Sequence, residues 1–116
     1  MTQHPIELFP RKIEGILILS PEGRIDHSNA EALGLALKPY LLDCKPGGHK
    51  IVLDLSRLNY ISSAGLRILM IASKQVKSQQ GVVVVAAMQP IVREIFDISK
   101  FTFVFECFNS VDEAIH

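Results

Sequence analysis

The start of the chain alternates short apolar runs with turn residues, a pattern typical of β-structure. Residues 6–13 and 16–23 predict two short strands, and the second contains an uninterrupted run of Ile and Leu. Glu14 and Gly15 lie between them and are compatible with a turn. The chain is therefore expected to open with a β-hairpin.

A helical period replaces the strand pattern in the next segment. Apolar residues recur at helical spacing from about residue 28 to residue 43, which predicts an amphipathic helix. Asp26 or Ser28 is available as its N-cap. Pro39 lies inside the segment and has no backbone N–H, so we expect it to kink or shorten the helix.

The middle of the chain carries the pattern of a βαβ unit. Residues 51–55 and 82–86 are nearly continuous apolar runs, which are typical of strands buried on both faces. Residues 56–62 predict a loop, and residues 63–80 predict the helix between the two strands. The strands should therefore be parallel, with a right-handed crossover.

Three further elements are expected toward the C-terminus. Pro90 suits the first turn of a helix over residues 90–99, residues 101–105 predict a last strand, and residues 110–115 predict a short helix. Together the elements predict an α/β fold, in which about four helices pack against a mixed, mostly parallel sheet of roughly four or five strands. An antiparallel strand of the N-terminal hairpin should form one edge of that sheet.

The composition is that of an ordinary globular domain. The 116 residues are 48% hydrophobic and 21% charged, with a formal net charge of zero at neutral pH. A chain of this length is expected to form one domain over residues 1–116. Because acidic and basic residues balance in each half of the chain, neither nucleic acid nor an anionic membrane surface is an expected partner.

Signals for export, membrane insertion and catalysis are missing from the sequence. The apolar runs are too short to cross a bilayer, and the widely separated Cys44 and Cys107 favour free thiols in a reducing cytoplasm. No phosphate-binding glycine loop, nucleophile motif or zinc-binding histidine pair occurs. We therefore expect a cytoplasmic protein with no metal and no cofactor, and not an enzyme.

A pair of serines opens the predicted helix after the central strand. Ser62 or Ser63 is suited to cap that helix, since a serine oxygen can accept a hydrogen bond from one of the first backbone N–H groups. The same position also suits a phosphoryl group, because the helix dipole stabilises added negative charge and Gly65 adds no side chain. The two roles remain open from the residues alone.

The helix that follows has a wide apolar face. Leu66, Leu69 and Met70 form one stripe, and Ile68 and Ile71 widen it. The additional surface is expected either to pack inside the domain or to contact a partner, and the pattern does not choose between them.

Two segments carry a family resemblance. The first is Gly23-Arg24-Ile25-Asp26, and the second begins Asp54-Leu55-Ser56 and ends Tyr60-Ile61-Ser62-Ser63-Ala64-Gly65-Leu66. In this combination and spacing they resemble the STAS domain of bacterial anti-sigma factor antagonists. The order of the predicted elements and the chain length fit the same fold.

The resemblance implies regulation by partner switching. Proteins of this family bind an anti-sigma factor that is also a serine kinase, are phosphorylated by it, and are reactivated by a PP2C-type phosphatase. The antagonist itself is not an enzyme, and we expect a monomer or weak dimer. The alternative is a STAS module that serves as a non-switching scaffold subunit of a transport or signalling complex, in which the serine is only a helix cap.

The resemblance also implies roles for individual residues. Aligned on Gly65 and Leu66, the phosphorylated serine of the family falls on Ser63, and Ser62 replaces the usual Asp and is the rival acceptor. Asp26 matches the Asp of the first motif, on a loop expected to contact the partner. Together with the apolar helix face, the expected partner-binding surface comprises Asp26, Ser62, Ser63, Ala64, Gly65, Arg67, Ile68 and Ile71.

Overall fold

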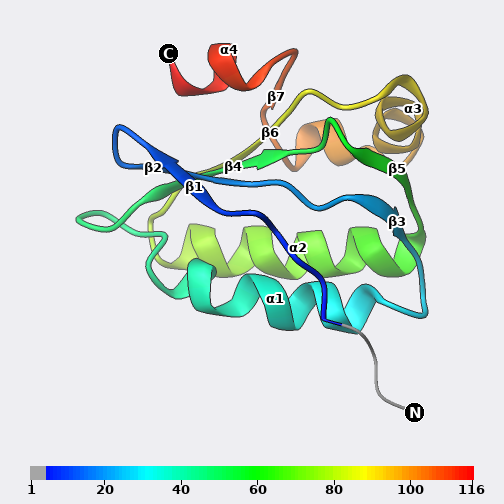
Figure 1. The fold of residues 1–116 in the computed structure, drawn as a ribbon, viewed down its shortest axis with the longest axis horizontal. Helices are drawn as coiled ribbons and strands as arrows, with labels where there is room; N and C mark the ends of the chain where they lie inside the picture. The colour runs from blue at the N-terminus through cyan, green and yellow to red at the C-terminus, as the bar shows by residue number, and fades with distance from the viewer. Residues whose placement is uncertain (1–4) are drawn as a thin grey trace.

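Figure 1 shows the computed structural model of the protein, which describes residues 5–116. Its main sheet has five strands in the order β1-β2-β4-β6-β7. Strand β1 runs antiparallel to β2, and the other neighbours are parallel. The strands span Arg11–Ile13 (β1), Ile16–Leu19 (β2), Lys50–Asp54 (β4), Val83–Ala86 (β6) and Cys107–Phe108 (β7). The predicted mixed sheet with an antiparallel N-terminal edge is confirmed.

A second, two-stranded sheet was not expected. Strand β3 (Gly23–Ile25) pairs in parallel with β5 (Leu58–Ile61). The predicted strand 16–23 therefore ends at Leu19, because Pro21 cannot donate a ladder hydrogen bond, and only its last residue, Gly23, belongs to β3. The segment 56–62, predicted as a loop, contains β5, which is too short to show a clear period in the sequence.

The helices cover both faces of the main sheet (Figure 1). Helices α1 (Ala30–Leu42) and α2 (Ser63–Ser78) lie side by side on one face, and the short α4 (Val111–Ile115) lies on the other. Helix α3 (Pro90–Ile98) packs against β5 and is followed by a 3₁₀ turn, η1 (Phe101–Phe103). The prediction of about four helices is confirmed for the described residues.

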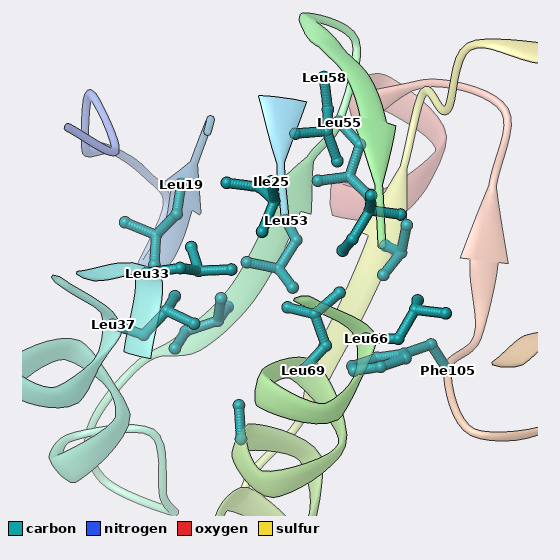
Figure 2. Close-up of a cluster of buried hydrophobic side chains, with 14 of the residues drawn as sticks. Leu19, Ile25, Leu33, Leu37, Leu53, Leu55, Leu58, Leu66, Leu69 and Phe105 are labelled. Atoms are coloured by element: carbon teal, nitrogen blue, oxygen red, sulfur yellow. The ribbon is translucent and has the colours of Figure 1, made fainter. Parts of the chain in front are cut away.

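The core follows from the alternation of side chains along the central strand. On β4, Ile51 and Leu53 point to the face covered by α1 and α2, whereas Val52 points to the face covered by α4. Figure 2 shows leucines of both long helices meeting the strand residues of the larger core. Burial on both faces explains why this strand reads as a continuous apolar run.

Residues 101–105 do not form the predicted strand. Phe101 and Phe105 both pack against Phe96, with ring centroids 5.8 and 6.5 Å from it, whereas Phe103 is 84% exposed. Phe101 and Phe105, four residues apart, therefore lie on the same side of a helical turn. The alternation of Phe101, Phe103 and Phe105 suggested a strand, but the same residues also contain a spacing of four, which fits a helical turn.

Helix α1 begins later than predicted and tolerates its proline. Asn29, not Asp26 or Ser28, precedes the first helical residue, and its side chain makes no cap hydrogen bond to the helix. Pro39 lies inside α1, and the helix continues to Leu42. The missing N–H of Pro39 removes one hydrogen bond without ending the helix.

Candidate functional site

The β3–β5 pair brings the two family motifs together. Ile25 and Ile61 are neighbours in the register, and the Ser62 N–H donates to the Ile25 carbonyl at 2.8 Å. Asp26 follows β3 directly, and Ser62 and Ser63 follow β5 at the same end of this sheet. The structure therefore places the Asp26 loop beside the serine pair, as expected from the sequence.

The Asp26 loop is held by its own hydrogen bonds. The Asp26 carboxylate accepts from the Ser28 hydroxyl at 2.6 Å and from the Ser28 N–H at 2.9 Å. These two hydrogen bonds hold the pKa of the Asp26 carboxyl below its ordinary value. Asn29 joins the loop to β3, because its side chain accepts from the Asp26 N–H and donates to the Arg24 carbonyl. The loop thus presents an ionised carboxylate in a fixed position.

The two serines occupy different positions at the start of α2. Ser62 is the N-cap, and its hydroxyl accepts from the Gly65 N–H at 3.4 Å. Ser63 is the first residue of the helix and is exposed. Within residues 5–116 the Ser63 hydroxyl makes no hydrogen bond, so the capping role belongs to Ser62 and the Ser63 side chain is accessible.

Gly65 allows the start of α2 to approach the small sheet closely. A Cβ atom at this position would lie 2.6 Å from Ile25 Cγ2 and 2.7 Å from Ile61 Cγ1, far inside ordinary contact. The glycine is therefore required by the packing of α2 on β3 and β5. Its neighbour Ala64 is partly buried against the core.

The remaining predicted residues lie along α2. Arg67 is exposed, Ile68 is partly buried, and the Ile71 side chain is 54% exposed. A groove of about 180 Å³ runs between α1 and α2 and is lined by Gly34, Leu37, Lys38, Leu41, Ile68, Ile71, Ala72 and Gln75. Packing against α1 therefore accounts for Ile68, whereas Ile71 stands at the rim of the groove with half of its surface free.

Asp54 supports the site from the end of the central strand. Its carboxylate accepts from the Ser56 N–H at 3.0 Å and from the Ser20 hydroxyl at 3.3 Å, and Arg11 lies 3.8 Å away. These contacts join the chain after β2 to the chain after β4. They fix the segments that lead into β3 and β5, a role that the sequence did not reveal.

The small sheet also carries a stacked pair of side chains that the sequence did not predict. Arg24 and Tyr60 are register partners, and the Arg24 guanidinium lies 4.3 Å from the centroid of the Tyr60 ring. The same guanidinium is 3.9 Å from the Asp26 carboxylate. No sequence signal could find this contact, because the pairing of β3 with β5 was not predicted.

Two kinds of site are not found in the described residues. None of the helices within residues 5–116 is long and apolar enough to span a bilayer. The same residues contain no cluster of three or more His, Cys, Asp or Glu side chains suited to hold a metal ion.

Comparison with known proteins assigns this arrangement to a family. The model of the STAS domain family matches residues 10–114. The chain is also 42% identical over 109 residues to BtrV of Bordetella bronchiseptica, which is assigned as an anti-sigma factor antagonist, and the match covers 94% of this chain and 91% of BtrV. The chain belongs to the STAS domain family, and the resemblance recognised in its motifs is confirmed.

Solved structures agree with that assignment. An anti-sigma factor antagonist from Mycobacterium paratuberculosis is 25% identical, with a TM-score of 0.82 over 95% of this chain and 91% of that one. The Bacillus cell fate determinant SpoIIAA in its phosphorylated form is 17% identical, with a TM-score of 0.63 over 95% of this chain and 94% of that one. The likeness to SpoIIAA is one of fold alone.

Proposed function

We propose that the protein is an anti-sigma factor antagonist that works by partner switching. In this proposal the chain acts as one cytoplasmic domain that binds an anti-sigma factor while Ser63 is unmodified. The partner is also a serine kinase, and phosphorylation of Ser63 releases it; a PP2C-type phosphatase restores binding. The observation that carries the proposal is the accessible Ser63 hydroxyl beside the Asp26 loop. The similarity to BtrV supports it.

The chemistry belongs to the kinase. The Ser63 Oγ attacks the γ-phosphorus of ATP, the bond from that phosphorus to the bridging oxygen breaks, and ADP leaves. The hydroxyl proton passes to a base of the kinase. The antagonist supplies a nucleophile on a rigid helix end and no catalytic group, which makes it a substrate and a binding protein rather than an enzyme.

The added charge explains how binding is lost while the fold is kept. Phosphorylation adds about 1.5 to 2 negative charges where the partner surface fits a neutral hydroxyl. Removing that charge from water at the interface costs several kcal/mol, and about 4 kcal/mol already weakens binding roughly a thousandfold. At the start of α2 the same charge is stabilised by the helix dipole, by about 0.3–1 kcal/mol. The modified domain should therefore stay folded.

The geometry favours Ser63 over Ser62 as the acceptor. The Ser62 hydroxyl accepts the Gly65 N–H, and a phosphoryl group on its oxygen would disturb the N-cap. The Ser63 hydroxyl has no such role. Modification of Ser63 therefore leaves the start of the helix intact.

The partner should contact the Asp26 loop and the exposed edge of α2. The Asp26 carboxylate is fixed by Ser28 and lies next to the serine pair. Asp26→Ala is expected to weaken binding while the domain stays folded. A loss of stability above about 2 kcal/mol with unchanged affinity would assign Asp26 a purely structural role.

Co-purification from the native cell with intact mass measurement would identify the partner and any added phosphate together. With the kinase in hand, phosphopeptide mapping after incubation with ATP should place the phosphate on Ser63. Ser63→Ala should bind constitutively, and Ser63→Asp should bind poorly, with Ser62→Ala as the matched control that remains a substrate. Phosphate on Ser62, or unchanged affinity of Ser63→Asp, contradicts the proposal and favours a non-switching scaffold subunit.

A further inference from the structure

The exposed face of α2 forms a row that begins at Ser63. Ser63, Arg67, Ile71 and Lys74 are all exposed and follow one another at intervals of three or four residues. Side chains at such intervals are neighbours on a helix surface. Ser63 and Arg67 are therefore one turn apart, with their side chains on the same side of the helix.

This row carries positive charge, and helix α2 itself supplies no acidic residue. Helix α2 contains Arg67, Lys74 and Lys77 and no Asp or Glu. A negative group added at Ser63 would meet a basic helix face. The charged and titratable groups on the segments next to the start of α2 are Arg24 on β3, Asp26 and His27 on the following loop, Tyr60 on β5, and Glu31 in the first turn of α1. Arg24 already lies beside Asp26.

Arg67 differs from the other arginines of the chain. Arg11, Arg24, Arg57 and Arg93 each lie within 4 Å of a carboxylate. Among the described residues, Arg67 has no carboxylate within that distance. The one arginine without a counter-ion thus stands one turn from the proposed phosphorylation site.

We propose that Arg67 is the internal counter-ion of phosphorylated Ser63, an inference that rests on the proposed function. A guanidinium donates two parallel N–H groups to phosphate oxygens, and the spacing of one helical turn brings the two groups within reach. Phosphorylation then withdraws Arg67 from the docking surface as well as adding charge to it. The modified serine and the arginine form one unit of the switch.

The second pKa of the phosphate tests this pairing directly. Phosphoserine would be installed at position 63 during translation by codon suppression, and its ³¹P resonance followed through a pH titration. A neighbouring guanidinium favours the dianion, so Arg67→Gln should raise the second pKa by about 0.3–0.7 units, from a value near 6. Arg67→Lys should recover part of the difference, because the charge remains but the planar fork does not.

Lys74→Gln is the matched control. It removes the same charge from the same exposed row, about 16 Å along the helix from residue 63 and beyond the screening length of about 8 Å. It should leave the phosphate pKa unchanged. Equal pKa values for the unsubstituted protein and Arg67→Gln, or equal shifts for Arg67→Gln and Lys74→Gln, would overturn the proposal.

The titration is independent of the kinase. Because the phosphoserine is encoded, failure of any kinase to modify Ser63 would refute the proposed function without affecting the measured pKa. A normal switch with no change in pKa would refute only the role of Arg67. Arg67 is exposed, and cooperative thermal unfolding of each variant checks that the comparison is between folded proteins.

Discussion

Replacing Gly65 with alanine tests how closely α2 must approach the small sheet. The new Cβ would lie 2.6 Å from Ile25 Cγ2 and 2.7 Å from Ile61 Cγ1, against the 3.4 Å at which ordinary contact begins. Neither isoleucine can yield easily, because both are buried with about 1% of their surface exposed. Overpacking of this kind costs about 1–3 kcal/mol, and the better helix propensity of alanine returns at most about 1 kcal/mol. We expect a net loss of about 1–2 kcal/mol.

Gly34→Ala in α1 is the matched control. A Cβ at that position would lie 3.5 and 3.6 Å from two atoms of Ile68, which is ordinary contact. The control should therefore stabilise the domain by about 0.5–1 kcal/mol through helix propensity alone. Urea unfolding followed by far-ultraviolet circular dichroism measures both variants, with an unchanged slope and a shifted midpoint. Gly65→Ala at least as stable as the unsubstituted protein would refute the reasoning.

Three further predictions concern side chains of the site and the core. Ile71→Asp should abolish partner binding and leave a cooperative unfolding transition, because the side chain is 54% exposed; an insoluble or molten variant would assign Ile71 to the core. The lowered pKa of the Asp26 carboxyl stabilises the folded state above the unfolded pKa near 3.8, and this stabilisation is lost as the pH falls through the folded pKa. The stability deficit of Asp26→Asn should therefore shrink when urea unfolding is measured below about pH 4. Cys44 is 0% exposed, and burial raises the pKa of its thiol. A disulfide reagent should therefore modify Cys44 only on unfolding, and rapid reaction in the native state would contradict the packing.

The sequence predicted the elements that carry a clear pattern of buried apolar residues. The strand over Ile51 to Leu53 is buried on both faces, and α2 has a buried stripe that includes Leu66 and Leu69, so each carries an unmistakable apolar pattern. Strands β3 and β5 have three and four residues, and their identity depends on pairing with each other across a long stretch of chain. Local pattern contains no record of such a partner.

For the candidate site, the sequence predicted which residues belong to it but not their individual roles. The resemblance of the motifs located Asp26 and the serine pair, and the structure places them at one end of the β3–β5 sheet. The different positions of Ser62 and Ser63 needed the backbone, because either hydroxyl could have capped α2. The contacts of Asp54 with Ser20 and Ser56 likewise depend on segments that only the folded sheet brings together.

The pairing of β3 with β5 determines when this surface exists. Helix α1 and strand β4 separate the two strands in the sequence, so Asp26 and Ser63 become neighbours only after the intervening chain has folded. A peptide that contains Ser63 carries the hydroxyl but not the carboxylate beside it. A protein that recognises both groups therefore distinguishes the native domain from nascent or misfolded chains. It binds only the folded protein.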